Sequence, residues 1–361
     1  MKVTFFIGGL SGGGAERVTC NMANYLAGKG HDIKIMTMSD DKPTYALNNY
    51  VQRIPLLLAT ERKNFIYNSA LRLYKFIKHL LKSQVDAYVV MLPMTTIMLL
   101  RLRFLTKAKV IAAERVDPSQ YSVKKQRQLK SLAKKADGWA FQTEEEHNWY
   151  GDFTGDAKVR IIPNAINPDF INQPYTGVRK KTIVTAGRLT EQKNHTLLIK
   201  AFARISPSYP DYKLVIYGDG ILKAKYVKIA EDHGIKSKVI LPGYTTNIGG
   251  NIKDASLFVL SSDFEGMPNA LMEAMALGIP CISTDCDGGG AKFLLDNEEN
   301  GLLVPKGDVE ALATAMERML SDREFADECG REAHKICERL APERIYREWE
   351  LFIEEIVKGN K

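Results

Sequence analysis

Short runs of apolar residues recur along the chain and alternate with longer amphipathic stretches. The short runs are rich in β-branched and aromatic residues, so they predict buried strands, and the stretches between them predict helices. We expect strands over residues 3–8, 32–38, 85–91, 109–113, 137–142, 159–162, 182–186, 213–217, 238–242, 255–261 and 280–284. Strands that alternate with helices form parallel sheets, so the predicted fold class is α/β.

The length of 361 residues suits two domains better than one. The polar stretch 172–181 (NQPYTGVRKK) is typical of a linker. We therefore expect a first domain over residues 1–171 and a second over residues 182–342. Residues 343–361 predict a last helix with one apolar face, which includes Trp349.

Residues 262–280 (SDFEGMPNALMEAMALGIP) predict a loop and a helix that follow a buried strand. Pro268 suits the first helical position, and the N–H groups of Asn269, Ala270 and Leu271 would then suit an anion such as phosphate. A carboxylate near a phosphate is repelled by it, so Glu273 fits a role in binding neutral hydroxyls such as those of a ribose. Glu265, on the loop, would face the other end of the ligand.

Several segments together resemble the retaining GT-B glycosyltransferases of family 4. The two glutamates form an E-x7-E motif with Gly266 and Pro268 inside it, and Gly187, Arg188 and Lys193 match a G-R-x4-K motif. Further matching segments are GGAER at 13–17, GKGHDI at 28–33 and PNAIN at 163–167. The resemblance implies two Rossmann-like domains with parallel sheets that face each other across a cleft. It also implies that the first domain binds the acceptor, the second binds a nucleotide sugar, and the last helix crosses back to the first domain.

The resemblance further implies a role for each matching residue. Arg188, Lys193 and Glu265 would be catalytic, with the two cations on the donor diphosphate and Glu265 on the sugar. The residues expected to bind the donor are Gly12, Gly13, Gly14, Gly187, Gly218, Gly243, Tyr244, Gly266, Met267, Asn269, Ala270, Leu271 and Glu273.

A polar cluster that follows the strand 109–113 is a candidate for contact with the acceptor or the sugar. It comprises Glu114, Arg115 and Asp117, and we add Asn164 from the segment PNAIN. The family often has a histidine after the glutamate, where this chain has Arg115. The alternative for this cluster is a plain turn with a helix cap.

The implied reaction transfers a hexose or N-acetylhexosamine from a nucleotide diphosphate sugar, with a UDP-sugar expected, and forms an α-glycosidic bond. The implied acceptor is a glycan or a polyprenyl-diphosphate-linked glycan, and no cofactor or metal is expected. A GT-B nucleotide-sugar epimerase and a catalytically idle nucleotide-sugar binder are the alternatives. Asp285 and Asp287 form a D-x-D pattern that can hold a divalent metal, but we expect a tight turn there.

A dinucleotide-binding oxidoreductase is disfavoured by the loop that follows the first strand. Gly12 and Gly14 would need a glycine at Arg17 to complete G-x-G-x-x-G. Without that fingerprint, Asp40 and Asp41 are expected to be turn residues and not ribose ligands.

Positive charge is concentrated in the first half of the chain. The net charge is +7; residues 1–175 carry 25 Lys and Arg against 15 Asp and Glu, and the rest carry 25 against 28. Residues 62–82 predict a basic amphipathic helix, and further basic clusters lie at 101–109 and 124–135. Such clusters fit peripheral contact with an anionic membrane, although an ordinary packed helix with a solvated basic face fits as well. Nucleic acid is not expected, because no aromatic platforms are interleaved with these cations.

The five cysteines are odd in number and form no C-x-x-C motif, which indicates reduced thiols in the cytoplasm. No signal peptide is expected at the N-terminus, and the longest apolar stretch, 87–100, is interrupted by Pro93. The expected location is therefore the cytoplasm, on the cytoplasmic face of the inner membrane.

Overall fold

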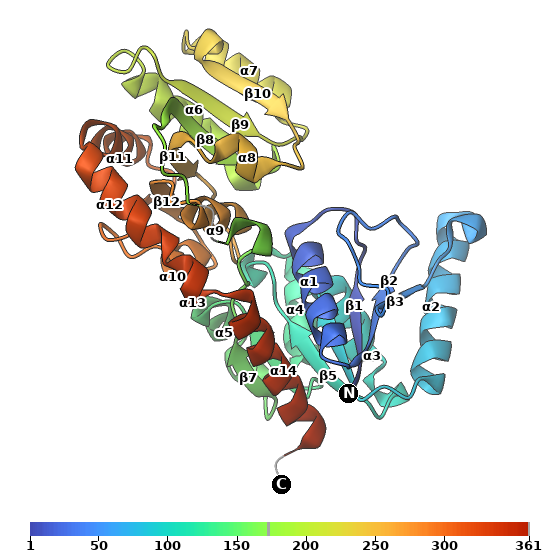
Figure 1. The fold of residues 1–361 in the computed structure, drawn as a ribbon. Helices are drawn as coiled ribbons and strands as arrows, with labels where there is room; N and C mark the ends of the chain where they lie inside the picture. Colours follow the sequence, from blue (N-terminus) through green and yellow to red (C-terminus); the bar gives the residue numbers. More distant parts are fainter. Residues whose placement is uncertain (172–173, 360–361) are drawn as a thin grey trace. The chain divides into compact units, whose positions relative to one another are not determined.

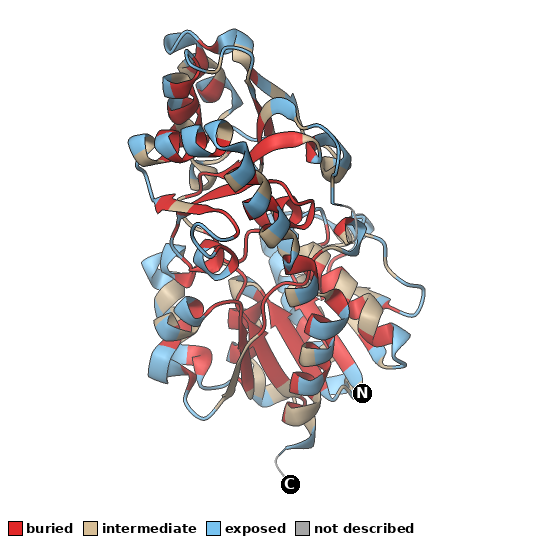
Figure 2. Ribbon diagram, turned by 60° about the vertical axis from the view of Figure 1, so that its left-hand side comes forward, coloured by how far each residue is buried: buried red, intermediate tan, exposed pale blue. Residues whose placement is uncertain are grey.

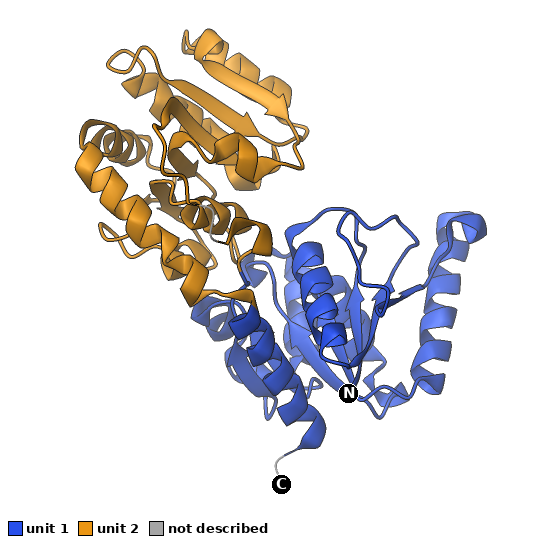
Figure 3. Cartoon of the chain, in the orientation of Figure 1, with its two compact units in different colours: residues 1–165, 343–361 blue, residues 166–342 orange. Residues whose placement is uncertain are grey.

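The computed structural model describes residues 1–171 and 174–359, which form two compact units (Figure 3). Unit 1 comprises Met1–Ala165 and Glu343–Lys361, and unit 2 comprises Ile166–Pro342. Residues 172–173 of the expected linker and residues 360–361 of the expected last helix lie outside the described residues. Each unit has a parallel sheet with helices around it, so the predicted α/β class is confirmed (Figure 1).

Unit 1 contains a seven-stranded parallel sheet with the order β3-β2-β1-β4-β5-β6-β7. The strands are β1 (Lys2–Ile7), β2 (Asp32–Thr37), β3 (Gln52–Pro55), β4 (Ala87–Met91), β5 (Lys109–Ala113), β6 (Gly138–Phe141) and β7 (Lys158–Ile161). The helices are α1 (Gly14–Gly28), α2 (Phe65–Lys82), α3 (Pro93–Arg101), α4 (Val123–Ala133), α5 (Glu144–Tyr150) and α14 (Pro342–Lys358). The central strand β4 is buried along its whole length, as a strand covered on both faces should be. Figure 2 shows buried residues along the strands of both sheets.

The last helix, α14, packs within unit 1 through its apolar face. Trp349, Phe352 and Ile353 are almost fully buried, and the Arg115 guanidinium lies 5.1 Å from the centre of the Trp349 ring. Burying such large side chains supplies several kcal/mol of the free energy of folding, by about 25 cal/mol per Å² of apolar surface. The first unit is therefore built from both ends of the chain.

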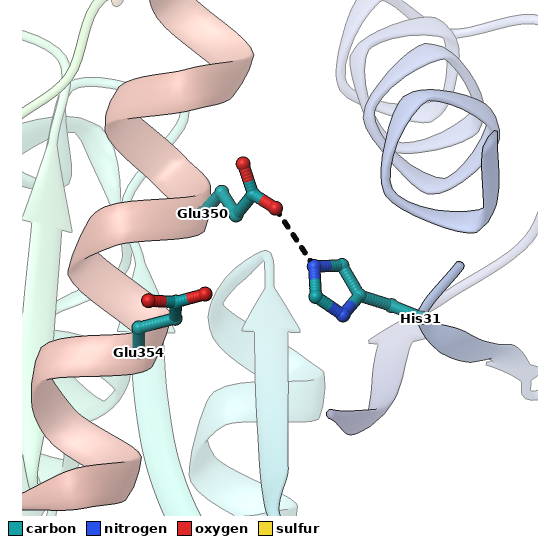
Figure 4. A group of neighbouring side chains, drawn as sticks. All are labelled: His31, Glu350 and Glu354. Atoms are coloured by element: carbon teal, nitrogen blue, oxygen red, sulfur yellow. Dashed lines mark hydrogen bonds and ion pairs between the residues drawn. The ribbon is translucent and has the colours of Figure 1, made fainter. Parts of the chain in front are cut away.

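A second contact of α14 joins it to the chain just before β2. The Nε2 atom of His31 lies 2.8 Å from Glu350 Oε1, and Glu354 lies one turn further along α14 (Figure 4). The three side chains place possible metal ligands within 4.8 Å of one another. However, His31 Nδ1 lies 3.1 Å from the terminal amine, and Glu350 Oε2 accepts a hydrogen bond of 2.5 Å from Arg347. The polar atoms of His31 and Glu350 thus already have partners. We call the contact between these two side chains, which holds α14 near β2, the clasp.

Unit 2 contains a six-stranded parallel sheet with the order β10-β9-β8-β11-β12-β13. The strands are β8 (Lys180–Ala186), β9 (Lys213–Tyr217), β10 (Val239–Gly243), β11 (Ala255–Leu260), β12 (Cys281–Asp285) and β13 (Leu302–Pro305). The helices are α6 (His195–Ile205), α7 (Lys223–Asp232), α8 (Ile248–Ile252), α9 (Asn269–Ala276), α10 (Gly290–Leu294), α11 (Val309–Ser321), α12 (Arg323–His334) and α13 (Ile336–Arg339). Leu198 and Phe202 of α6 lie in one core with Met316 of α11 and the strands.

The structure departs from the sequence predictions in a few elements. Strands β3 and β13 were not predicted. Pro268 is the N-terminal cap of α9 and not its first helical residue, since its ψ of 94° is extended. No helix in the described part of the chain is both long and apolar enough to cross a bilayer.

Candidate functional site

The sheet of unit 2 has its topological switch point between β8 and β11. From β8 the chain adds β9 and β10 on one side, and β11 then starts the other side with β12 and β13. At such a switch point the strand order reverses, and the loops that follow the two strands border a crevice at the carboxyl edge of the sheet. Ligands of open α/β sheets bind in this crevice. Lys193 follows β8 and Glu265 follows β11, so the switch point brings the two predicted residues together.

Lys193 and Glu265 form an ion pair in this structure. The Nζ atom of Lys193 lies 2.5 Å from Glu265 Oε1, with 14% of the lysine side chain and 8% of the glutamate side chain exposed. The Ser262 hydroxyl donates a second hydrogen bond to Glu265 Oε1, at 2.6 Å. A lysine has three N–H donors, so Lys193 can bind the carboxylate and a ligand oxygen at the same time.

Arg188 lies on the same loop as Lys193, but the surroundings of its side chain differ. Its side chain is exposed, and among the described residues it takes part in no ion pair. Gly187, beside it, leaves room for the lysine, because a Cβ there would lie 3.1 Å from Lys193 Cε. The loop thus offers one cation already held by a carboxylate and one that faces solvent.

Hydrogen bonds fix the two loops against each other. The backbone N–H of Asp263 donates to Gln192 O at 2.9 Å, and Asn194 Nδ2 donates to Asp263 Oδ1 at 2.8 Å. Gln192 Nε2 also donates to the carbonyl of Phe264 at 3.0 Å. Lys193 and Glu265 are therefore positioned by a shared backbone framework and not by their ion pair alone.

Close backbone contacts explain two of the glycines around these loops. A Cβ at Gly218 would lie 2.0 Å from the carbonyl oxygen of Gly187, and one at Gly290 would lie 1.7 Å from that of Gly266. Gly218 also has a φ of +135°, which side chains rarely adopt. The turn after β9 thus supports the Arg188 loop, and the start of α10 supports the Glu265 loop.

Helix α9 begins directly after the Glu265 loop. Glu273 is buried with 6% exposed, Met267 is also buried, and Asn269 and Ala270 are partly exposed at the first turn. The N–H of Leu271 donates to Pro268 O at 3.1 Å, so the expectation that it is available to an anion is wrong. The tightened first turn, which Pro268 caps, is the physical reason.

The predicted base-binding turns after β9 and β10 are joined. Gly218 N donates to Gly243 O at 3.0 Å, and Tyr244 N donates to Asp219 Oδ2 at 2.9 Å. The Tyr244 side chain is 61% exposed. These turns form one surface at the carboxyl edge of the sheet of unit 2.

The glycine loop of unit 1 does not present all of its N–H groups to a ligand. The N–H groups of Gly12 and Gly13 both donate to Glu16 Oε2, at 2.6 and 2.9 Å. A carboxylate therefore occupies the position at the start of α1 where the sequence predicts a phosphate or sugar, and Gly14 is the first residue of α1. A ligand phosphate would have to displace Glu16 there.

The polar cluster after β5 is buried within unit 1. Glu114 accepts hydrogen bonds from the hydroxyls of Tyr121 at 2.6 Å and Tyr150 at 2.8 Å, and Arg115 Nη1 donates to Asn164 Oδ1 at 3.3 Å. Burial raises the pKa of Glu114 and lowers the pKa of Arg115 to about 10. Asp117 accepts from Ser119 N at 2.9 Å and so caps a short helical turn. The structure brings the four predicted residues into one region but gives each an internal partner.

In the D-x-D pattern, Asp285 is the last residue of β12, Asp287 pairs with Phe264 in a bridge, and the expected tight turn follows at Gly288. Gly288 and Gly289 both have positive φ values, and the Asp287 carboxylate lies 2.6 Å from Lys306 Nζ. The backbone of Asp287 pairs with the Glu265 loop, since Glu265 N donates to Asp287 O at 2.9 Å. Asp287 thus supports the loop that carries Glu265.

Two residues that hold Glu265 were not singled out from the sequence. Ser262 lies three residues before Glu265, a spacing at which a hydroxyl can reach a carboxylate across a turn, and that spacing was a signal. Gln192 precedes Lys193 directly, but its hydrogen bond to Phe264 O joins the loop after β8 to the loop after β11. Only knowledge of the strand order would have indicated it.

Comparisons with known proteins identify the family. The model of Glycosyltransferase Family 4 matches residues 12–170, and that of Glycosyl transferases group 1 matches residues 168–336. The chain belongs to these glycosyltransferases. The glycosyltransferase resembles an alpha-1,4-N-acetyl-D-galactosaminyltransferase of Campylobacter jejuni, named for the acceptor GalNAc-alpha-(1->4)-GalNAc-alpha-(1->3)-diNAcBac-PP-undecaprenol. The two are 28% identical over 99% of each chain.

Two further matches bear on its length and fold. An exopolysaccharide phosphotransferase of Streptomyces coelicolor is 35% identical over 60% of this chain, but that match spans only 23% of the relative. The structure of Anabaena HepE in complex with UDP-glucose superposes with a TM-score of 0.82 at 16% identity, over 98% of this chain and all of the other. The GT-B fold class predicted for this glycosyltransferase is confirmed. The comparisons do not support the epimerase or the idle binder.

Proposed function

We propose that this glycosyltransferase transfers a hexose or N-acetylhexosamine from a UDP-sugar to a polyprenyl-diphosphate-linked glycan and retains the α configuration. The observation that carries the proposal is the pairing of Lys193 with Glu265 at the switch point of unit 2, with Arg188 exposed on the same loop. The alpha linkage and the PP-undecaprenol acceptor named for the Campylobacter jejuni relative support the linkage and the acceptor class. The UDP-glucose complex of the structural neighbour supports the donor.

In the proposed reaction, the anomeric C–O bond of the donor breaks and negative charge moves onto the departing diphosphate. An acceptor hydroxyl oxygen bonds to the anomeric carbon, and its proton passes to the departing phosphate. Arg188 can bind phosphate oxygens as a fork, and Lys193 can add a point charge. The N-terminus of α9 adds N–H groups and a favourable dipole. Each such contact is worth roughly 2 to 4 kcal/mol when it is stronger in the transition state.

The two glutamates take different parts of the donor in this proposal. Glu265 contacts the sugar and stabilises the oxocarbenium-like centre, while Lys193 separates its charge from that of the phosphates. Glu273, buried on α9, accepts hydrogen bonds from the ribose hydroxyls. In this proposal the base binds at Gly218, Gly243 and Tyr244, on the joined turns after β9 and β10.

We place the acceptor and the membrane contact on unit 1. Its net charge is +10, from 29 Lys and Arg against 19 Asp and Glu, whereas unit 2 carries 21 against 24. A basic unit suits a diphosphate-linked acceptor and the anionic cytoplasmic face of the inner membrane.

The test is a transfer assay with a panel of nucleotide sugars and a polyprenyl-diphosphate glycan. We expect release of UDP and a mass gain of one sugar only when both substrates are present, with a product α linkage by NMR. A parallel reaction with EDTA should keep its rate, because Arg188 and Lys193 are proposed to do what a divalent metal does elsewhere. Donor conversion without acceptor, or a β product, would contradict the proposal.

A further inference from the structure

Helix α2 exposes an unusual number of large apolar side chains. Phe65 is 83% exposed, Ile66 80%, Leu81 63% and Tyr74 60%, whereas Phe76 and Leu80 are buried against the rest of unit 1. Figure 1 shows α2 at the outer edge of unit 1, beside β3. A helix with only one buried face normally carries polar residues on the others.

The exposed apolar residues form a continuous stripe along α2. Tyr74 follows Ile66 by eight residues and Leu81 follows Tyr74 by seven, so all three lie on one face. At 1.5 Å per residue, the stripe is about 22 Å long. A stripe of this length can lie flat in the interface of a bilayer.

Cations flank this stripe. Lys63, Lys78 and Lys82 are exposed, and within the described part of the chain none of them takes part in an ion pair. The amine of Lys63 lies 4.8 Å from the ring centre of Tyr67, and that of Lys78 lies 5.9 Å from that of Tyr74. The free charges therefore sit beside the exposed rings.

The other two basic clusters of unit 1 lack this combination. Arg103 and Lys109 both pair with Asp137, at 2.9 and 3.2 Å. Helix α4 carries exposed cations, but among the described residues Val123 is its one exposed large apolar side chain. Of the three clusters predicted from the sequence, α2 alone among the described residues joins unpaired cations to a long apolar stripe.

We propose that α2 docks this enzyme on an anionic lipid bilayer, with Ile66, Tyr74 and Leu81 in the interface and Lys78 and Lys82 on lipid phosphates. The apolar stripe supplies the burial, and the lysines supply charge complementarity. The inference rests on the proposed function, because it brings the enzyme to the surface that holds a lipid-linked acceptor.

The test is flotation of the full chain with vesicles, in the absence of substrates. We expect binding to phosphatidylglycerol–phosphatidylcholine vesicles and little binding to phosphatidylcholine alone. We expect binding to weaken at least tenfold in Ile66→Ser/Leu81→Ser, because this variant removes apolar surface from the interface. We expect a loss of at least tenfold in Lys78→Glu/Lys82→Glu as well, because a lysine near an anionic surface is worth about fivefold in binding. The charge reversal should also lower the dependence of binding on salt concentration.

Matched controls lie elsewhere on the chain. Ile221→Ser removes an equally exposed apolar residue of unit 2, and Lys124→Glu/Lys135→Glu reverses two exposed cations of the α4 region. Both controls should bind vesicles as the wild type does. Equal losses in the controls, or full binding by the α2 variants, would overturn the proposal.

Two further measurements separate other outcomes. If α2 is instead a contact between two copies of the chain, sedimentation equilibrium will show a dimer that the Ile66→Ser/Leu81→Ser variant dissociates, and vesicles will not compete. A rise in melting temperature with UDP reports on donor binding independently. The α2 variants should keep that rise, so a failure of the docking proposal and a failure of the proposed donor are told apart.

Discussion

Arg188 and Lys193 belong to one loop, but their surroundings give them different duties. Lys193 shares a buried ion pair with Glu265, whereas Arg188 is exposed and has no ion pair among the described residues. Removing one partner of a buried pair leaves an uncompensated charge, while removing an exposed cation does not. At the scale of single residues, stability and catalysis can therefore be separated on this loop.

Arg188→Ala should lower kcat about 100-fold without changing the melting temperature, because the role proposed for its charge is confined to the departing diphosphate. Lys193→Ala should lower kcat similarly and also destabilise unit 2 by about 3 kcal/mol, because Glu265 loses its partner. Steady-state kinetics and thermal unfolding measure the two effects. Arg204→Ala, an exposed cation of α6, is the control, and a melting-temperature loss in Arg188→Ala equal to that in Lys193→Ala would refute the distinction.

His195, at the start of α6, predicts a pH dependence of stability. Burial, and then the Lys193 charge, lower its pKa from 6.5 to about 4. Between these values the unfolded chain binds a proton at His195 that the folded chain does not, so the free energy of unfolding falls as pH drops from about 6.5 towards 4. The loss from this group amounts to roughly 3 kcal/mol and is absent above pH 7.

The measurement is urea unfolding of the wild type and His195→Gln at several pH values. The difference between the two proteins should change by that amount across pH 4 to 6.5, because glutamine does not titrate. Other buried acids titrate in both proteins and cancel in the difference. Parallel curves would show that His195 is not responsible.

At the scale of elements, the loops that carry Arg188 and Glu265 are held by backbone contacts so close that only glycine fits there. Gly290, the first residue of α10, lies against the carbonyl of Gly266, and Gly218 lies against that of Gly187. The loop positions therefore depend on glycines outside the predicted catalytic set. The sheet places these turns at one edge, and the glycines set their spacing.

Gly290→Ala should displace the Glu265 loop, because its new Cβ would lie 1.7 Å from Gly266 O. We expect a loss of about 1 to 3 kcal/mol in the free energy of unfolding and a donor KM raised at least tenfold. Unfolding and kinetic measurements check the two values. Gly28→Ala at the end of α1, where no atom lies within 4 Å, should change neither.

The strands that the sequence predicted are the apolar ones. The runs 109–113 and 213–217 match β5 and β9 residue for residue, because buried parallel strands are nearly all apolar. Strands β3 (QRIP) and β13 (LLVP) were missed, and both are short edge strands that end in proline. Strand β3 has few apolar residues, whereas β13 is apolar but only four residues long with a proline at its end, so its length and its proline hid it.

The residues of the candidate site could be predicted from the sequence, but the contacts between them could not. The motifs pointed to Lys193 and Glu265 separately, yet the residues are 72 positions apart and meet only because β8 pairs with β11. Strand order is set by the packing of the whole sheet, which local patterns do not contain. The capture of the Gly12 and Gly13 N–H groups by Glu16 has a different cause, because it spans only three and four residues; the capping-box spacing of Gly13 and Glu16 was a local signal for it.

At the scale of the whole molecule, the chain ends complete one unit. Helix α14 supplies Trp349 and Phe352 to the core of unit 1, and the clasp between His31 and Glu350 fastens it near β2. Unit 2 has a core cluster of its own, which includes residues from Ile183 to Cys329. A change in α14 should therefore affect the stability of unit 1 selectively.

Trp349→Ala is the change that tests this division. Removing a fully buried tryptophan leaves a cavity and costs about 3 to 5 kcal/mol, and it also deprives Arg115 of the ring that covers its guanidinium. Hydrogen exchange followed by mass spectrometry should show faster exchange in peptides from β5 to β7 and from α14. Peptides from β8 to β13 should keep their rates.

Leu351→Ala, on the same helix but 42% exposed, is the matched control and should leave every peptide unchanged. Uniformly faster exchange across both units in Trp349→Ala would mean that the two cores unfold as one cooperative body. Faster exchange confined to α14 would mean that the helix opens without the sheet. Only faster exchange in both α14 and β5 to β7, with β8 to β13 unchanged, fits a core that α14 completes.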